Sequence, residues 1–273
     1  MFFIANHPIY NHPLPEGHRF PMLKYELLPK QLLHEGTAEC TDFYSPDSID
    51  LSLVHAVHTV SYVKALTELT LDAKAVRSIG FPLSAALVER ELRIAQGTVV
   101  GCNHALENGI AFNIAGGTHH AFSDRGEAFC LLNDQAIAAQ YLINQKKCHK
   151  ILIVDLDVHQ GNGTAEIFQN NADVITFSMH GQSNYPFRKE TSDYDIALPD
   201  KTDDTTYLSI LQETLPELLN IHRPDFVFYL AGVDILGTDK LGKLGCTLEG
   251  CKTRDSYVLG LCKSLGIPVQ VSM

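Results

Sequence analysis

The stretch ILIVDLDVHQGNG, residues 151–163, joins a short aliphatic run to a group of acidic and imidazole side chains. The aliphatic run is typical of a buried strand, yet Asp155, Asp157 and His159 follow it directly. Side chains at positions i, i+2 and i+4 of an extended chain face the same side. If strand geometry persists, we expect these three side chains to project together from the carboxyl end of the strand.

The two aspartates of this stretch need a positive charge or a hydrogen-bond donor beside them. Carboxylates held close together repel one another, and one pKa rises unless a cation or donor lies between them. Aspartate and histidine are suitable ligands for a borderline divalent ion. The motif alone fits a metal site and a capping role equally well, because HQGNGT at 159–164 is expected to form a turn.

Apolar runs alternate with helical patterns along most of the chain, which is typical of a parallel sheet covered by helices on both faces. Strands are expected at residues 2–6, 109–117, 150–158, 173–179, 225–232 and 267–273. Helices are expected at residues 84–107, 133–145, 204–220 and 249–266. Residues 6–30 should form a loop with a short helix, and residues 180–203 a surface loop. With no linker or repeat, residues 1–273 are interpreted as one domain.

The composition is that of a globular enzyme and limits its partners. Apolar residues make up 45% and charged residues 19% of the chain, and the formal net charge is -11. The basic face that a general nucleic-acid binder needs is therefore not expected. The chain has no apolar window near the ~18 residues of a membrane span and no basic leader, and its seven cysteines form no C-x-x-C pair. These features predict a cytoplasmic protein with reduced thiols and no membrane contact.

Two further predicted strands also end in polar side chains. AGGTHHAF at 115–122 places His119 and His120 after a glycine turn, and YLAGVDILGTDKLGKL at 229–244 places Asp234 after another. Adjacent imidazoles suit acid–base work because each can titrate near neutral pH. Ligands of open α/β sheets bind at the carboxyl edge of the strands. Taken together, the three strand ends favour a metal-dependent site over a set of unrelated turns.

The motifs GGTHHA, VDLDVHQGNGT, TFSMH and AGVDILGTDKLGKL resemble, in order and roughly in spacing, those of the histone deacetylase family. HPLPEGHRFPMLKY and GFPLSAALVERELRIAQGT resemble bacterial and class IV-like members. The resemblance implies the arginase/deacetylase α/β fold, a single three-layer domain with a central, mostly parallel sheet of about eight strands. It also implies hydrolysis of an N-acyl amide in an acyl-lysine peptide or a small acetylated amine.

The resemblance assigns roles to the residues at the strand ends. Asp157, His159 and Asp234 would bind Zn²⁺, with Fe²⁺ as the alternative. His119 and His120 would be the acid–base pair, and Asp155 would accept a hydrogen bond from His119. A structural K⁺ would be held by Asp155, Asp157, His159, Ser178 and Met179. The substrate channel would be lined by Phe129, Tyr185, Phe187 and Leu241.

The chain departs from the family pattern at two places. Asn162 stands where many members have an aspartate that pairs with the second histidine, and a neutral partner raises that pKa less than a carboxylate would. The last predicted strand ends at Met273, before the family's glycine-rich turn and its tyrosine, whose hydroxyl stabilises the oxyanion. Losing one oxyanion donor typically costs about 10²–10³ in rate. We therefore expect a truncated deacetylase domain that binds metal but hydrolyses its substrate slowly.

Two other functions remain open from the sequence. An arginase-like ureohydrolase shares the fold but needs ligands for two metals, and glycines 161 and 163 follow the motif here instead of further acids. A non-catalytic module that binds acylated amines would explain the missing tyrosine turn, while the histidine pair argues against it.

Overall fold

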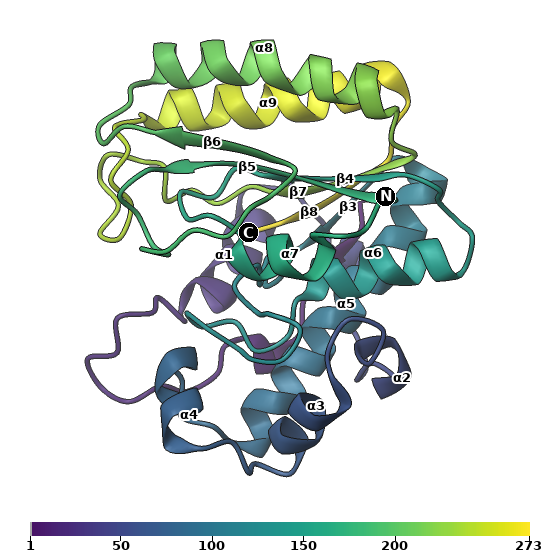
Figure 1. Cartoon of the computed structure of the whole chain (residues 1–273), viewed down its shortest axis with the longest axis vertical. Coiled ribbons are helices and arrows are strands. Elements are labelled where there is room, and N and C mark those ends of the chain that lie inside the picture. The colour runs from purple at the N-terminus through teal and green to yellow at the C-terminus, as the bar shows by residue number, and fades with distance from the viewer. Residues whose placement is uncertain (1) are drawn as a thin grey trace.

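Eight parallel strands form one sheet at the centre of the protein, whose computed structural model describes residues 2–273 (Figure 1). The strand order across the sheet is β2-β1-β3-β8-β7-β4-β5-β6. The strands are β1 (Ile4–Ala5), β2 (Phe43–Tyr44), β3 (Ile110–Asn113), β4 (Ile151–Asp155), β5 (Val174–Gly181), β6 (Tyr194–Leu198), β7 (Phe226–Leu230) and β8 (Val269–Ser272). The predicted α/β fold with about eight strands is confirmed.

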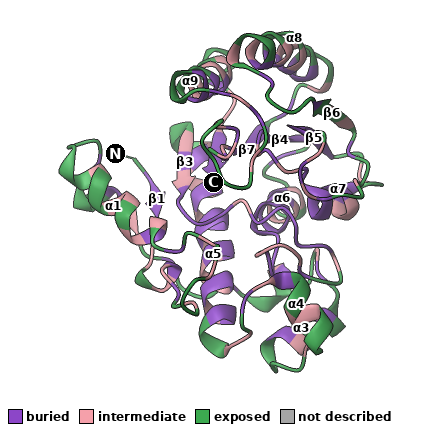
Figure 2. Ribbon diagram, turned by 90° about the vertical axis from the view of Figure 1, so that its left-hand side faces the viewer, coloured by how far each residue is buried: buried purple, intermediate pink, exposed green. Residues whose placement is uncertain are grey.

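Helices cover both faces of this sheet. The pair α8 and α9 lies on one face, and α5, α6 and α7 lie on the other (Figure 1). The α-helices are α1 (Lys24–His34), α2 (Leu51–Val54), α3 (Val60–Thr67), α4 (Ala73–Ile79), α5 (Ala85–Asn108), α6 (Asp134–Asn144), α7 (Asn162–Phe168), α8 (Asp204–His222) and α9 (Leu248–Leu265). Each face has its own cluster of buried apolar side chains, and Figure 2 shows the central strands buried between the two layers.

The central strand β4 is apolar because both of its faces are covered. All five of its residues are buried, and it pairs with β5 on one side and β7 on the other. The sequences of central strands in parallel sheets are continuous aliphatic runs because both faces are buried. Asp155 is in register with Ser178 of β5 and Leu230 of β7, so the loops after the three strands leave from one edge.

The structure corrects two local predictions. Residues 180–203 are not only a loop: β5 continues to Gly181, and β6 forms the edge of the sheet. Exposed and half-buried residues alternate in β6, so it lacks the apolar run of a central strand. HQGNGT is not a simple turn, because α7 begins at Asn162. The short helices α2, α3 and α4 also lie in a region where the apolar pattern predicts no element.

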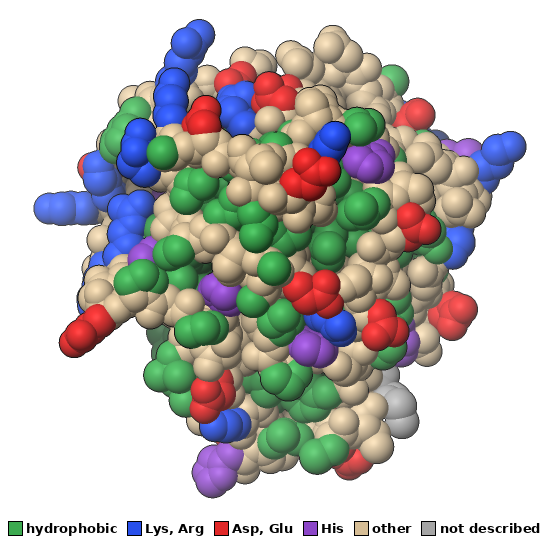
Figure 3. Space-filling view, turned by 90° about the horizontal axis from the view of Figure 1, so that it is seen from below, with side chains coloured by type: hydrophobic (Ala, Val, Ile, Leu, Met, Phe, Trp, Pro, Cys, Tyr) green, Lys and Arg blue, Asp and Glu red, His purple; other side chains and the backbone are tan. Residues whose placement is uncertain are grey.

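The surface and the helices agree with the composition. On the face seen from below, hydrophobic, acidic and histidine side chains are interspersed, and lysine and arginine side chains lie mainly near the margins (Figure 3). Within residues 2–273, none of the helices combines the length and apolarity that crossing a bilayer requires. All seven cysteines are free thiols.

A buried histidine joins α6 to the segment that follows the histidine pair. Nδ1 of His58 lies 2.9 Å from the carbonyl oxygen of Phe122, and the backbone N–H of Asn133 donates to its Nε2 at 3.0 Å. This arrangement requires the neutral ring, with its proton on Nδ1. Burial lowers the pKa of His58 to about 4, although the backbone contact at Phe122 opposes the change.

His58 should therefore make the protein sensitive to acid. Between about pH 7.5 and about pH 5 it should reduce the free energy of unfolding by about 2 kcal/mol, because its pKa is about 6.5 in the unfolded chain and about 4 when folded. Urea unfolding with a metal chelator present, at both pH values, checks this for the wild type and His58→Gln. The loss on acidification should be about 2 kcal/mol smaller in the variant. Equal losses in the two proteins would contradict the assignment.

Candidate active site

Three loops meet at the carboxyl edge of the sheet and carry the side chains predicted at the strand ends. His119 and His120 lie in the loop after β3. Asp157 and His159 lie in the loop after β4, and Asp234 lies in the loop after β7. Because β8 lies between β3 and β7, its carboxyl end reaches the same edge. The sheet topology thus brings together residues that are more than a hundred positions apart in the chain.

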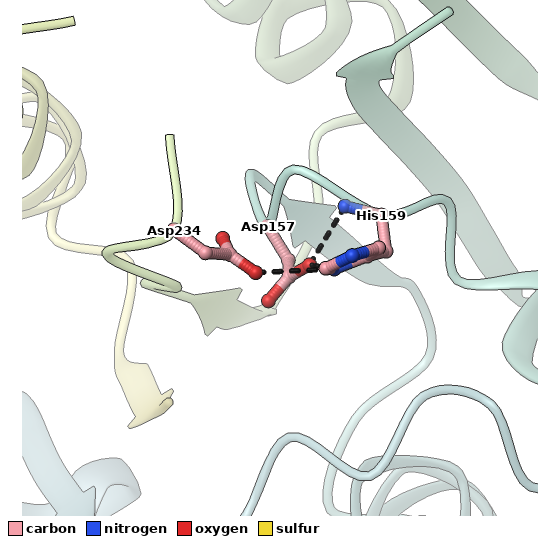
Figure 4. A group of neighbouring side chains, drawn as sticks. All are labelled: Asp157, His159 and Asp234. Atoms are coloured by element: carbon pink, nitrogen blue, oxygen red, sulfur yellow. Dashed lines mark hydrogen bonds and ion pairs between the residues drawn. The ribbon is translucent and has the colours of Figure 1, made fainter. Parts of the chain in front are cut away.

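Asp157, His159 and Asp234 point toward one another from two loops (Figure 4). Nδ1 of His159 lies 2.9 Å from Oδ1 of Asp157 and 3.1 Å from Oδ2 of Asp234. One ligand atom from each residue lies within 4.8 Å of the other two. The backbone N–H groups of Val158 and His159 donate to Asp234 and Asp157, which fixes the orientation of the carboxylates.

This cluster of Asp157, His159 and Asp234 favours a positive charge at its centre. Burial disfavours the charged form of His159, but the two carboxylates outweigh it and raise the pKa of His159 to about 10. Burial, and then the neighbouring Asp157, raises the pKa of Asp234. One imidazole and two carboxylates match the donor set of a catalytic zinc site, which keeps a position for water or substrate. The residues present fit Zn²⁺, and Fe²⁺ accepts the same types of ligand.

The adjacent imidazoles of His119 and His120 border this cluster, with ring centroids 4.2 Å apart. Nδ1 of His119 lies 2.7 Å from Oδ2 of Asp155, and Nδ1 of His120 lies 2.6 Å from Oδ1 of Asn162. Nε2 of His119 is 3.9 Å from Oδ1 of Asp157. Each imidazole is thus held through Nδ1, which leaves its Nε2 for chemistry. A Cβ at position 161 would collide with the Asp155 carboxylate, so this turn requires glycine.

The two partners give the histidines different pKa values. Burial disfavours the charged form of His119, but the Asp155 carboxylate outweighs it and raises the pKa of His119 to about 9. Burial, and then the neighbouring His119 and His159, lowers the pKa of His120 well below its usual value, and the Asn162 amide opposes this only in part. The pair is therefore asymmetric, because His119 holds a second proton more readily than His120 does.

Asn133 and Asp134, at the start of α6, hold the loop that carries the histidine pair. Oδ1 of Asp134 accepts the backbone N–H groups of Gly117 and Thr118, both at 2.9 Å. The Asn133 amide donates to the carbonyl oxygen of Ala121 on the other side of the pair at 3.2 Å. Gly117 has φ +83, a conformation that favours glycine. The histidines are thus anchored on both sides to one helix terminus.

Arg254 of α9 holds the loops that carry Asp157 and Asp234 in a similar way. Its side chain is fully buried, and its guanidinium donates to the carbonyl oxygens of Leu156, Ala231 and Gly232 at 3.1, 3.2 and 2.7 Å. Leu156 precedes Asp157, and the other two lie just before Asp234. A single side chain thereby fixes the spacing of two loops that come from different strands.

The residues predicted to hold potassium also lie at this edge. Asp155, the last residue of β4, is the register partner of Ser178 within β5, and both are buried together with Met179. Oγ of Ser178 lies 3.0 Å from Nδ1 of His180. The expectation that Asp155 projects together with Asp157 and His159 is wrong. β4 ends at Asp155, and the Asp155 side chain points to His119 instead.

The residues predicted to line a channel fall into different environments. The ring of Tyr185 stands edge-on to His120, with centroids 5.0 Å apart. Leu241 is brought to this loop by a hydrogen bond from the Asn184 amide to its carbonyl oxygen at 2.9 Å. Phe187 contacts Tyr185 at 6.3 Å between centroids but is 89% exposed.

Phe129 packs in an aromatic cluster instead of standing alone. Its ring lies 5.1 Å from both Phe20 and Phe81 and 5.8 Å from His18, measured between centroids. The guanidinium of Arg19 lies over its outer face at 5.0 Å. The cluster joins the amino-terminal segment to the loop that follows the histidine pair.

Sequence reasoning missed the residues that hold the site in place. Asn133 and Asp134 signal a helix start, but nothing in their neighbourhood indicates a link to the loop of His119 and His120. Arg254 lies within a helical pattern whose buried face is otherwise apolar and small. The one available signal is a charged residue on that face, which must find a partner when buried.

Replacing Arg254 by lysine should loosen the loops that carry Asp157 and Asp234 while keeping the charge. A compact ammonium cannot reach all three carbonyl oxygens, so zinc affinity should fall about 10–100-fold. Competition with a chromophoric zinc chelator measures the change, and Arg93→Lys, whose partly exposed ion pair with Glu89 lies within α5, is the matched control. If Arg254→Lys binds zinc like the wild type but unfolds more easily, Arg254 serves stability alone.

Comparison with known proteins places this chain in a family. A model of the histone deacetylase domain matches residues 18–273. An uncharacterized protein of Picosynechococcus sp. is 47% identical over 98% of this chain and 89% of its own length. Histone deacetylase 2 of Arabidopsis thaliana is 28% identical, over 92% of this chain and 67% of its own length. A crystal structure of a histone deacetylase homologue bound to SAHA shares the fold, with a TM-score of 0.86 and 22% identity over 100% of this chain and 79% of that one. The chain belongs to the histone deacetylase family.

Proposed function

We propose that this protein removes an acyl group, such as acetyl, from the amine of an acyl-lysine or a related acetylated amine by zinc-dependent hydrolysis. The observation that carries the proposal is the contact between two sets of residues. The three-residue cluster of Asp157, His159 and Asp234 lies against a histidine pair whose two members have different partners. This combination suits hydrolysis better than binding alone. Family membership supports the same class of reaction.

Asp157, His159 and Asp234 would hold the zinc ion. When bound, the ion would polarise the substrate carbonyl and make water a better nucleophile near neutral pH. The protein's part is to keep one position of the ion open and to exclude bulk water, and the three side chains are only 16–21% exposed.

The histidine pair would divide the proton transfers. His120, neutral because its pKa is lowered, would accept the proton of the attacking water at Nε2. His119, charged because Asp155 raises its pKa, would donate a proton from Nε2 to the departing amine. Asn162 would fix the tautomer of His120 by accepting its Nδ1 proton. The aspartate that is common in the family at position 162 would raise the pKa of His120, so that both imidazoles would be charged together more readily.

The remaining predicted residues would complete the site. Tyr185 would form the channel wall beside His120, with Phe129, Phe187 and Leu241 nearer its entrance. A potassium ion bound by Asp155, Asp157, His159, Ser178 and Met179 would offset the negative charge beneath the zinc ligands. Burial of Ser178 and Met179 beside Asp155 supports such a site.

The arginase-like alternative receives less support. It needs ligands for two metal ions, and in residues 2–273 a single three-residue group of suitable side chains was found. The binding-module alternative differs from the proposal only in turnover, so one assay separates them.

The proposal predicts zinc-dependent deacetylation that requires His120. With zinc present, an acetyl-lysine peptide or an acetylated polyamine should be hydrolysed, and His120→Ala should reduce kcat about 10²–10⁴-fold. His149→Ala is the control, because its side chain is 89% exposed and precedes the amino end of β4, at the opposite edge of the sheet from the site. Release of acetate measures turnover, and calorimetry measures peptide binding. Binding without turnover in the wild type would favour the module, and an equal rate in His120→Ala would contradict the acid–base role.

A further inference from the structure

A hydrogen bond joins the loop that carries Tyr185 to the segment that follows the histidine pair. The hydroxyl of Tyr185, in the loop between β5 and β6, donates to Oε2 of Glu127 at 2.6 Å. Glu127 belongs to the segment that follows the histidine pair, and its side chain is 23% exposed. The two residues are separated by 58 positions in the chain. The contact is therefore a tertiary link between two segments that border the proposed channel.

The carboxylate of Glu127 is held in place from its other side. Nε of Arg125 donates to Oε1 of Glu127 at 2.9 Å, and the guanidinium also lies 3.5 Å from the ring centroid of Phe122. Asp124 accepts a further bond from Arg125 at 3.0 Å. Both oxygens of Glu127 are thus engaged, Oε2 by Tyr185 and Oε1 by Arg125. The carboxylate is consequently held in place and suited to fixing a neighbour.

The other end of the link bears on the reacting groups. The ring of Tyr185 stands at 86° to the ring of His120, with centroids 5.0 Å apart. Burial, and then the bond to Glu127, raises the pKa of Tyr185, so its hydroxyl keeps the proton that it donates. The aromatic neighbour of Tyr185 on its outer side, Phe187, is largely exposed and cannot confine the ring. Glu127 accepts the one hydrogen bond that this hydroxyl donates.

We propose that Glu127 is a specificity-determining positioning residue, which fixes the Tyr185 ring beside His120 and so limits the size of the acyl group that the site accepts. The proposal rests on the proposed deacylase function and adds its substrate class: short acyl groups, acetyl before butyryl. Glu127 acts through Tyr185 and does not touch the substrate. When the bond is lost, the ring can turn away from His120, and the space beside the reacting amide widens.

Variants that break the bond from either end should have the same effect. Tyr185→Phe keeps the ring but removes the donor, and Glu127→Ala removes the acceptor. Each should lower the preference for acetyl-lysine over butyryl-lysine peptide about tenfold in kcat/KM, since each methylene in an apolar pocket is worth about 10–200-fold in discrimination. The change should lie mainly in KM. The double variant should be no worse than either single variant, because both remove one interaction.

Two further variants distinguish positioning from a general structural role. Glu127→Gln keeps an acceptor oxygen and should retain most of the acetyl preference. Tyr194→Phe removes the hydroxyl that lies 2.9 Å from Nε2 of His222, at the far edge of the sheet, and should leave specificity unchanged. Urea midpoints of all variants show whether the fold is intact. Additive effects in the double variant, or an acetyl preference that survives in both Tyr185→Phe and Glu127→Ala, would overturn the proposal.

Failure of this inference can be told apart from failure of the proposed function. The same acetyl and butyryl peptides are titrated into the zinc-loaded proteins by calorimetry. If the wild type shows no turnover, the deacylase function fails, and the binding ratio still tests the Glu127–Tyr185 bond. A wild-type preference for acetyl that falls in the variants supports the bond, and an unchanged ratio refutes it.

Discussion

The rest of the site depends on three carboxylates at the edge of an apolar sheet. Asp155 is the last residue of β4 and is buried, and the largely buried Asp157 and Asp234 follow β4 and β7, whose residues are all buried. An unpaired charge there would be strongly destabilising. The protein gives each of them partners. Asp155 takes the imidazole of His119, while the other two share His159 and accept backbone N–H groups. A divalent ion bound by Asp157, His159 and Asp234 would supply the positive charge that the cluster still lacks.

The surrounding structure keeps these partners in register. Arg254 spans the loops after β4 and β7, and Asn133 with Asp134 spans the loop of the histidine pair. Each of these groups comes from a helix packed on the sheet, one from either face. The loops of the site are therefore tied to rigid elements through hydrogen bonds to their backbone, which is how catalytic geometry is preorganised.

The fold and the central site residues could be predicted from the sequence because the evidence for them is local. Aliphatic runs mark the strands, and His119, Asp157 and Asp234 each lie within a few residues of such a run. The residues that hold the site could not be predicted in this way. Arg254 contacts a carbonyl 98 positions away, and Tyr185 contacts a carboxylate 58 positions away. Strand periodicity predicted that Asp157 and His159 project together. They do lie side by side although the strand stops at Asp155, because the bend that follows turns them toward each other.

The metal content of the purified protein tests the central claim most directly. After dialysis against zinc, elemental analysis should find one zinc ion per chain in the wild type and in His120→Ala, and almost none in Asp157→Ala. Two ions per chain would indicate the dinuclear chemistry of an arginase-like enzyme. Full zinc retention in Asp157→Ala would contradict the account, because the ion would then be bound somewhere other than the cluster of Asp157, His159 and Asp234.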